Sequence, residues 1–408
     1  MVEFLAEGNI SMKEVYIHPI WESISIHPHN DGLSLLYIYD IEEDREVLIN
    51  LKNIDTHTTI LDKITFSFER AYVHGNKGLL NHIQIPNSVD AGWVKYLHSN
   101  SPLQSIATPT HTFYHRRFSN LKGVNNLIPI SKQIEMIRDV RNDFLQYYDL
   151  GGVSFECVKK FENFYIKPLH KVESNGIYTT NGLEWTEYHP FTITSRPSNN
   201  FGGINYAALN KDDGSRDRFV SRFEGGKLVQ FDYDAYHPRI IGKLIGYELP
   251  KTSVHQWLAD QYGVPYEESK GITFQLLYGG IPEEFDEIPY YKGVREFIDK
   301  LWSKSTEVGY LQTQHRRIPL SSIEGVNPQK LFNYLLQATE TELNMGVMKR
   351  VVEFIKQTKI ELTLYTYDSF LFSYPLDTPK EDARKLKEII ESFGFPIKAD
   401  WGTDYGKL

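Results

Sequence analysis

Two aspartates stand where apolar runs of the sequence end, and together they could bind metal ions. Asp232 ends the run KLVQFD, and Asp368 lies in the turn between the runs IELTLYT and FLFSYP. Hard cations such as Mg²⁺ prefer oxygen ligands, and protein carboxylates usually supply one or two of them. If the fold brings both side chains together, they can hold two divalent cations that stabilise the attacking and leaving oxygens of a phosphoryl displacement. Aspartate is also common in turns, so either residue taken alone is better explained by turn chemistry.

A helical stripe lies between these two acids in the sequence. In YEESKGITFQLLYGG, residues 266–280, Lys270, Phe274 and Tyr278 recur at every fourth position and share one helix face. Taken alone, the pattern is typical of an amphipathic helix with a lysine at the edge of its apolar face. Beside two metal-binding acids it also suits a nucleotide, because the ammonium can contact phosphates and the rings can contact base and sugar.

The periodicity of the apolar residues predicts the elements that must position these side chains. The first 125 residues are strand-rich, and a helical period that starts at Ser131 predicts an amphipathic helix ended by Gly151 and Gly152. Strands and helices then alternate, as in an α/β (α+β) chain. We expect a second helix over 153–166, a strand over 227–234, a helix over 237–247 with Pro238 in its first turn, a helical block over about 251–357, a hairpin over 360–375 with Asp368 at its tip, and a helix that starts with a capping box at Thr378 and Glu381 and ends at Gly394.

The bulk composition is that of a globular protein with two or three structural units. The chain has 408 residues, of which 41% are hydrophobic and 24% are charged. Its one cysteine, Cys157, can form neither an internal disulfide nor a multi-thiolate zinc site, which fits a reducing compartment. The N-terminus lacks the pattern of a signal peptide, and no apolar run approaches the roughly 20 residues of a membrane span. We therefore expect a soluble, intracellular and cytoplasmic protein that does not bind membranes.

The charge distribution is acidic overall with local basic clusters. A net charge of −9 does not by itself indicate nucleic-acid binding. Basic clusters occur over residues 114–122, 159–171 and 313–319. Solvated surface explains such clusters, and so does a local basic track beside an acidic metal site.

Three segments in order along the chain resemble the motifs of family A DNA polymerases, the DNA polymerase I type. FDYDAYHPR (231–239) is similar to motif A, usually DYSQIELR; KGITFQLLYG (270–279) is similar to motif B, usually KxxxFGxxYG; and LYTYDSFLF (364–372) is similar to motif C, usually VHDE between strands. FNYLLQATETELNMGVMKRV (332–351) resembles the helix pattern NxxxQGTAADLxKxAM, and TITSRPSNNFGGINYAALN (192–210) resembles TGRLSSSDPNLQNIP. Each motif is short and degenerate, but the ordered set spans about residues 130–408 and is much more specific than any member.

The resemblance implies a right-hand polymerase fold with palm, fingers and thumb, and template-directed DNA synthesis. A primer 3′-OH would attack the α-phosphorus of a dNTP, and pyrophosphate would leave. Asp232 and Asp368, together with the carbonyl of Tyr233, would bind two Mg²⁺ ions, for which Mn²⁺ could substitute. Lys270 would contact the triphosphate as a catalytic residue.

The resemblance also implies contacts with the nucleotide and with DNA. The nucleotide-binding residues would be Tyr233, His237, Phe274, Tyr278 and Arg317. The residues that contact primer–template DNA would be Arg196, Asn205, Gln337 and Arg239, and Arg239 would also support the site. We expect primer–template DNA and dNTPs as partners, replisome proteins as further partners, and a monomeric enzyme.

The sequence departs from the family pattern at the sugar-selecting position. The glutamate of motif A works with the motif B tyrosine to reject a ribose 2′-OH, and it is His237 here. His237 could still form a hydrogen bond with Tyr278. The preference for dNTPs over rNTPs is therefore open.

Other departures from the family pattern change charged and small residues near the site. The Asp-Glu pair of motif C is Asp368-Ser369, and the glycine after the motif B phenylalanine is Gln275. The first arginine of motif B is Tyr266, for which Arg316 or Arg317 could substitute. Asp234 is an additional acid, although the alternation of a strand would point it elsewhere. We expect a divergent, phage-like or plasmid-like enzyme.

The motifs divide the chain into five segments. We expect an exonuclease-like domain over residues 1–125, the thumb and the start of the palm over 126–190, the palm with motif A over 191–250, the fingers with motif B over 251–335 and the palm with motif C over 336–408. Relatives with a 3′–5′ exonuclease carry DxE on its first strand. Here the stretch 23–40 takes that place, and His27-Pro28-His29 stands where the acids belong. We therefore expect a degenerate, RNase H-like domain without proofreading.

Three other functions stay open at this point, and each has a discriminating observation. An RNA-synthesising or sugar-promiscuous relative on the same fold would use rNTPs faster than dNTPs. A catalytically dead DNA-binding scaffold would bind DNA without metal-dependent incorporation. An unrelated nuclease that uses the same acids would cleave DNA instead of extending it.

Overall fold

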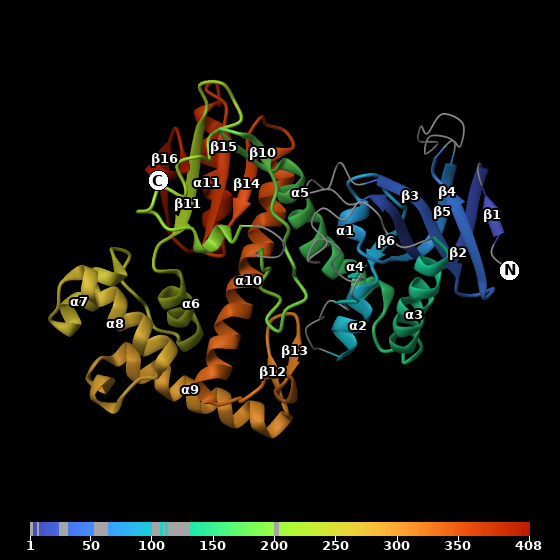
Figure 1. Ribbon diagram of the computed structural model, residues 1–408. Helices are drawn as coiled ribbons and strands as arrows, with labels where there is room; N and C mark the ends of the chain where they lie inside the picture. Colours follow the sequence, from blue (N-terminus) through green and yellow to red (C-terminus); the bar gives the residue numbers. More distant parts are fainter. Residues whose placement is uncertain are drawn as a thin grey trace. The chain divides into compact units, whose positions relative to one another are not determined.

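The computed structural model of the protein describes residues 3–5, 8–23, 32–52, 64–99, 107–108, 111–112, 130–199 and 204–408. The chain forms two compact units (Figure 1). The first unit comprises residues 1–176, 184–191 and 198–206, and the second comprises residues 177–183, 192–197 and 207–408. Most of the segment 126–190 therefore belongs to the first unit.

The first unit is built on a mixed six-stranded sheet in the order β1-β4-β3-β2-β5-β6. Its strands are β1 (Glu3–Leu5), β2 (Gly8–Ser23), β3 (Gly32–Asp40), β4 (Arg45–Asn50), β5 (Ile64–Val73) and β6 (Ser88–Asp90), and a separate pair consists of β7 (Ala107–Thr108) and β8 (His111–Thr112). Strands β2, β3 and β4 form an antiparallel meander, whereas β5 runs parallel to β2 and β6 runs parallel to β5. The expectation of a strand-rich N-terminal part is confirmed.

Strand β2 contains Pro19, although proline rarely occurs in central strands. The pairing of β2 with β5 ends at Ile17 opposite Val73. The carbonyl of Ile17 accepts a hydrogen bond from the His74 N–H at 2.8 Å, so residue 17 faces the β5 side. By the two-residue period of a strand, Pro19 faces the same side, where β5 has already ended and needs no further donor.

The residues that we expected in place of exonuclease acids, His27, Pro28 and His29, lie outside the described part of the chain. The stretch 23–40 that contains them begins at the last residue of β2 and includes β3. The absence of proofreading therefore stays a prediction.

The predicted helix after Ser131 is confirmed as α3 (Ile130–Asp149). Phe144 lies on its buried face, and its ring centroid lies 5.1 Å from that of Tyr16 and 5.2 Å from that of Tyr72. Gly151 and Gly152 follow the helix with φ of 66° and 82°, a conformation that glycine adopts without strain. The other helices of this unit are α1 (Asn76–Leu79), α2 (Gly92–Ser99), α4 (Phe155–Phe161), the π-helical turn Glu162–Ile166 and α5 (Lys167–Asn175).

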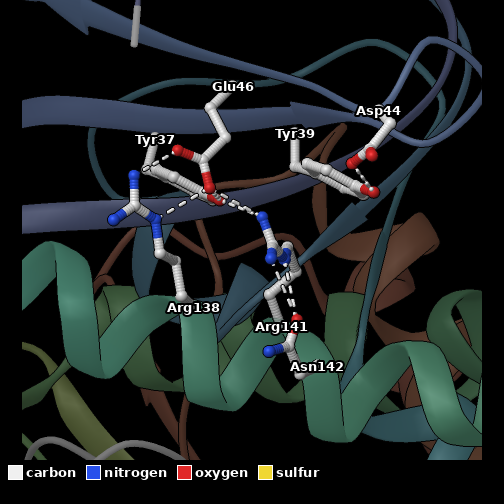
Figure 2. Close-up of polar contacts among 7 residues, drawn as sticks. All are labelled: Tyr37, Tyr39, Asp44, Glu46, Arg138, Arg141 and Asn142. Carbon is white, nitrogen blue, oxygen red and sulfur yellow. Dashed lines mark hydrogen bonds and ion pairs between the residues drawn. The ribbon is translucent and has the colours of Figure 1, made fainter. Parts of the chain in front are cut away.

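A carboxylate on β4 ties α3 to the sheet. The Glu46 carboxylate accepts hydrogen bonds from the guanidinium groups of Arg138 and Arg141 and from the Tyr37 hydroxyl (Figure 2). Arg141 also lies over the ring of Tyr39, with 4.3 Å from its guanidinium carbon to the ring centroid. The hydrogen bonds from Arg138 are the main cause that lowers the pKa of Glu46 to about 2.

The second unit contains an antiparallel sheet in the order β14-β15-β11-β16. Its strands are β11 (Lys227–Tyr233), β14 (Glu361–Tyr365), β15 (Ser369–Tyr374) and β16 (Ile397–Gly402), and the smaller strands β9 (Ile177–Thr179) and β10 (Gly182–Glu184) form a separate pair. The hairpin expected over 360–375 is confirmed as β14 and β15. Strand β16 was missed, because IKADWG mixes charges with apolar residues, yet it pairs with β11 along its whole length.

The helices of the second unit are α6 (Tyr236–Ile245), α7 (Val254–Tyr262), α8 (Tyr266–Gly279), α9 (Pro289–Val308), α10 (Pro328–Ile355) and α11 (Lys380–Ile390). The strand over 227–234 and the helix that begins near Pro238 are confirmed as β11 and α6. In the described part of the chain, no helix has the length and apolar character that a bilayer crossing requires.

The helical block expected over about 251–357 is confirmed in part, because α7, α8, α9 and α10 fill most of it. A hairpin of β12 (Tyr310–Gln312) and β13 (Arg317–Pro319) interrupts it between α9 and α10. The buried Leu311 and Ile318 pack in one cluster with residues of α10. The Glu342 carboxylate on α10 also accepts hydrogen bonds from the connecting turn, including one from the Thr313 hydroxyl at 2.7 Å. Tertiary contacts thus form a hairpin that local propensity does not predict.

The capping box expected at the start of α11 is wrong. The Thr378 hydroxyl donates to the carbonyl of Pro375 at 2.7 Å instead of capping the helix, which starts after Pro379 without a side-chain cap. The helix continues as a short 3₁₀ turn, and Gly394 ends that turn with φ of 77°.

The contact between Glu46 and α3 predicts a pH-dependent stability of the first unit. Because the pKa of Glu46 is lower in the folded state, its contribution is present above the ordinary value of 4.5 and is lost as the pH falls towards about 2. We expect Glu46→Gln to lower the free energy of unfolding at pH 7 by about 1–3 kcal/mol, and by much less at pH 3. Urea unfolding of the full chain at both pH values measures this.

The matched control is Glu42→Gln. The Glu42 side chain is half exposed, and its Oε2 lies 3.2 Å from the Nζ of the exposed Lys13. The free energy of unfolding of that variant should stay close to that of wild type at both pH values. An equal loss for Glu46→Gln at pH 7 and pH 3 would contradict the electrostatic role of Glu46.

Candidate active site

The pairing of β11 with β15 brings the two predicted metal ligands to adjoining strand ends. Asp232 lies opposite Ser369, the residue that follows Asp368. The next backbone N–H along β11, that of Tyr233, donates to the carbonyl of Asp368 at 3.0 Å. Asp232 and Asp368, which are distant in the sequence, therefore lie next to each other on two paired strands of the second unit, one at the end of β11 and the other just before β15.

The two carboxylates interact electrostatically. Burial and, second to it, the negative charge of Asp368 raise the pKa of Asp232 to about 7. Asp368 reaches solvent at the turn, yet the surrounding protein displaces enough water to raise its pKa as well, and the Glu340 carboxylate adds to this effect. A cation bound between the two aspartates would offset both the burial and the repulsion.

The turn before Asp368 has an unusual backbone conformation. Tyr367 has φ of 65°, a value that is uncommon for a residue other than glycine. The Thr366 N–H donates to the Ser369 carbonyl at 3.0 Å, and the hydroxyls of these two residues lie 2.6 Å apart. The side-chain amide of Asn344 donates to the Tyr367 carbonyl. These contacts hold the turn in the conformation that presents Asp368.

Two further strained residues lie beside the predicted site residues. Ala235 follows β11 with φ of 47°, and Ser195 precedes Arg196 with φ of 59°. Such conformations cost about 1–3 kcal/mol each and persist where the surrounding structure holds them. Their presence around Asp232 and Asp368 supports a functional site in this region.

Asp234 does not join the pair, but strand alternation is not the reason, because residues 232 and 234 of a continuous strand would share one face; β11 ends at Tyr233, and the backbone turns at Ala235 with φ of 47°. Its two carboxylate oxygens accept from Lys398 at 2.8 Å and from Arg239 at 3.0 Å. These two cations lower the pKa of Asp234 against the opposing effect of its burial. Asp234 is therefore held as a carboxylate in an ion-pair network and is not available as a metal ligand.

The donor set fits hard cations that keep other oxygen ligands. Within the described residues, no group of three or more His, Cys, Asp or Glu side chains is arranged to hold a metal ion. Mg²⁺ is commonly held by one or two carboxylates together with substrate phosphates and water, and Asp232 and Asp368 match that pattern. The side chain of Tyr233 is buried against Tyr236, so only its backbone carbonyl could contribute.

The predicted stripe on α8 is present. The rings of Phe274 and Tyr278 stack at 5.9 Å with 14° between their planes, and Phe274 is 47% exposed. One turn earlier, the Lys270 ammonium lies 4.4 Å from the centroid of the Tyr266 ring. An exposed aromatic face with a cation at one end can stack on a base and contact phosphates.

His237 and Tyr278 form a hydrogen bond between the His237 Nδ1 and the Tyr278 hydroxyl, as the sequence suggested. The partner on the other side of the ring was missed. Glu340 on α10 is buried, and its Oε1 lies 3.0 Å from the His237 Nε2. Its Oε2 lies 3.3 Å from the Nε of Arg196. A signal for Glu340 was present, since the pattern NxxxQGTAADLxKxAM has an alanine three positions after its glutamine, where this chain has Glu340.

The candidate DNA contacts have different environments. Arg239 donates to the Asp234 carbonyl at 2.9 Å and to the Pro250 carbonyl at 3.1 Å, which supports the end of β11. The Arg196 guanidinium stacks on the ring of Tyr367 at 3.7 Å. Gln337 lies half-buried on α10, whereas Asn205 is exposed in the first unit. Contacts of these residues with DNA stay predictions.

The two arginines considered as substitutes for the missing motif B arginine also differ. Arg316 is buried, and it donates to the Ser195 hydroxyl at 2.5 Å. Arg317 is exposed on β13, where its guanidinium lies 4.9 Å from the centroid of the Tyr310 ring. Only Arg317 has the exposure that a contact with a triphosphate requires.

Comparison with known proteins identifies the fold. No protein-family model and no curated protein matches the sequence. The structure is similar to that of the POL domain of Pol1 from M. smegmatis in complex with DNA primer-template and dNTP, with a TM-score of 0.70. The similarity covers 97% of this chain and 96% of that one, at 13% sequence identity. The chain therefore has the mixed α/β fold of a DNA polymerase domain.

The raised pKa of Asp232 predicts a stabilising substitution. The folded protein binds this proton more tightly than the unfolded chain, so its contribution to stability is present below pH 3.8 and is lost as the pH rises through about 7. With metal chelated, Asp232→Asn should raise the free energy of unfolding at pH 8 by on the order of 2 kcal/mol, and by little at pH 4. Thermal unfolding at both pH values measures the difference.

Asp234→Asn is the matched control, because the pKa of Asp234 is shifted in the opposite direction. Its contribution is present above the ordinary value of 3.8 and is lost at lower pH, so that variant should be less stable than wild type at pH 8. The interpretation of Asp232 fails if both variants change stability with the same sign at pH 8.

Proposed function

We propose that the protein is a template-directed DNA polymerase of family A that adds dNTPs to a primer 3′-OH. The observation that carries this proposal is the meeting of Asp232 and Asp368 across the β11–β15 pair in a chain with a polymerase-domain fold. Primer–template DNA and dNTPs are the partners we propose, and both are present in the similar structure.

The metal ions we propose are two Mg²⁺, for which Mn²⁺ could substitute, held by Asp232, Asp368 and the carbonyl of Tyr233. When bound, they supply charge that stabilises the attacking and leaving oxygens. The raised pKa of Asp232 supports this assignment, because a cation would favour the ionised form that burial disfavours. Both carboxylates must be deprotonated to act as ligands, so metal affinity should increase with pH up to about 7–8.

The remaining residues act by binding and orienting the reactants. Lys270 contacts the triphosphate, and Phe274 and Tyr278 line the pocket for base and sugar. Arg317 offers a second cation, whereas Arg239 supports the strand that carries Asp232. Since no covalent intermediate with the protein is needed, the rate depends on positioning and on charge stabilisation.

Further proposals follow from the sequence and concern the rest of the protein. The N-terminal sheet is a degenerate exonuclease-like domain without proofreading, and the enzyme is a divergent, phage-like monomer that works with replisome proteins. The antiparallel meander of β2, β3 and β4, together with β5 parallel to β2 and β6 parallel to β5, supports the RNase H-like assignment.

A sugar-promiscuous or RNA-synthesising enzyme is the second candidate function. It is favoured by His237, whose ring contacts Tyr278 at the predicted position of the sugar. Parallel primer extension with dNTPs and with rNTPs distinguishes the two, since faster use of rNTPs would select the second candidate.

Removal of either metal ligand should abolish synthesis. We expect Asp232→Ala and Asp368→Ala each to lower Mg²⁺-dependent primer extension at least about a hundredfold, because one stabilising group for the reacting oxygens is lost. DNA binding, measured by fluorescence anisotropy, should change little. The control is Asp260→Ala, which removes an exposed acid on α7. Retained extension in either ligand variant would refute the metal assignment.

Removal of the exposed ring on α8 should weaken nucleotide binding. We expect Phe274→Ala to raise the KM for dNTP about tenfold, because stacking of a base on an aromatic ring contributes about 1–3 kcal/mol. The melting temperature should hardly change, since the ring is 47% exposed. Leu376→Ala removes a side chain that is 76% exposed and serves as the control. An unchanged KM for dNTP in Phe274→Ala would contradict the proposal that Phe274 stacks on the base.

A further inference from the structure

A buried carboxylate on α10 lies behind the pair of side chains at the inner end of the α8 stripe. The Glu340 side chain is 2% exposed and the His237 side chain 13% exposed, and the His237 Nε2 lies 3.0 Å from the Glu340 Oε1. The Nδ1 of the same ring meets the Tyr278 hydroxyl. The three side chains therefore form a chain of contacts from α10 through α6 to α8.

The charge of Glu340 favours one tautomer of His237. The Nε2 of His237 and the Oε1 of Glu340 lie 3.0 Å apart without hydrogen-bond geometry, and a negative charge at this distance favours the tautomer with its proton on Nε2. In the neutral ring, Nδ1 then accepts from the Tyr278 hydroxyl. A carboxylate next to one ring nitrogen of a histidine fixes the tautomer and the orientation of the ring. The same arrangement occurs in many metal sites, where the other ring nitrogen binds the metal.

Arg196 holds Glu340 from the other side. Its Nε lies 3.3 Å from the Glu340 Oε2, and its guanidinium stacks on Tyr367 at 3.7 Å from the ring centroid. Tyr367 is the strained residue directly before Asp368. Glu340 is therefore held between the His237–Tyr278 pair and the turn that presents a proposed metal ligand.

We propose that Glu340 is a positioning residue that sets the sugar preference of the nucleotide site by orienting His237 and, through it, Tyr278. The proposal rests on the proposed polymerase function. The His237 Nδ1 is hydrogen-bonded to the Tyr278 hydroxyl and the Nε2 lies against the Glu340 carboxylate, so neither ring nitrogen faces away from these two partners towards a ribose 2′-OH. The oriented pair therefore offers a ribose 2′-OH no hydrogen-bonding partner, whereas a 2′-deoxy sugar needs none.

A charge-swap cycle tests this assignment. Glu340→Ala leaves His237 without its carboxylate, and His237→Glu places a second carboxylate against Glu340. Both single variants should lower the ratio of kcat/KM for dNTP to kcat/KM for rNTP, about tenfold or more. The double variant, His237→Glu with Glu340→Ala, retains one carboxylate next to Tyr278 and Arg196 and relieves the repulsion. It should recover most of the wild-type ratio.

The cycle separates positioning from simple support of the fold. If Glu340 only supports packing, the losses of the two single variants will multiply in the double variant, and that outcome overturns the proposal. Glu340→Gln keeps the volume of the side chain and should move the ratio in the same direction as Glu340→Ala without unfolding the protein. An unchanged ratio in this variant also overturns the proposal.

Two controls complete the experiment. Glu353→Ala removes a glutamate from the same helix, where it is 72% exposed and pairs with Lys356, and should leave the ratio unchanged. A wild-type protein that does not extend a primer at all would refute the proposed function itself. If wild type extends the primer but the losses of the two single variants multiply in the double variant, only the role of Glu340 is refuted.

Discussion

Two negative charges must be kept close together in this protein, and the antiparallel pairing of β11 with β15 keeps them there. The register places Asp232 opposite Ser369, and a backbone hydrogen bond joins Tyr233 to Asp368. Because successive side chains of a strand alternate, a slip by one residue would turn Asp232 to the other face of the sheet. Strand β16 on the far side of β11 and the packing of Phe231 against Phe372 oppose such a slip.

Holding this arrangement costs stability, and the cost is visible in two places. The pKa of Asp232 rises to about 7 because its charged form is buried beside another acid. The backbone at Tyr367 and at Ala235 takes up positive φ angles that residues with side chains avoid. Neither feature would persist if the surrounding structure did not stabilise it. The core around β11 does so, for example through the stacked rings of Tyr233 and Tyr236 at 4.1 Å.

Neighbouring acids behave differently because their partners differ. Asp234 stands two residues after Asp232, yet Lys398 and Arg239 lower its pKa while burial and Asp368 raise that of Asp232. On α10, Glu342 binds the turn of the β12–β13 hairpin, whereas Glu340 contacts His237 and Arg196. The function of each carboxylate follows from the groups that face it and not from its residue type.

Much of the site could be predicted from the sequence. The ordered motifs pointed to Asp232, Lys270 and Asp368 and to a polymerase fold, and the helical spacing of Lys270, Phe274 and Tyr278 predicted their common face. Apolar periodicity also located α3, β11, α6 and the β14–β15 hairpin. The predicted elements, the common face on α8 and the fold are confirmed because a local period or a short motif specifies each of them, whereas the roles of Asp232, Lys270 and Asp368 stay predictions.

The tertiary structure decided the rest. Strand β2 contains a proline whose position is acceptable only because β5 ends before it, and the β12–β13 hairpin forms against α10. Glu340 lies three residues after Gln337 in a helix that is buried along much of its length, and although the family pattern marks it as a departure, no local pattern shows that its carboxylate faces His237 and Arg196. By itself the sequence determined which residues could do chemistry and which elements carry them. The tertiary structure decided which side chains form ion pairs, hydrogen bonds and ring contacts. Folding alone brings these groups within a few ångströms, and electrostatic and hydrogen-bonding interactions depend on distance in space and not along the chain.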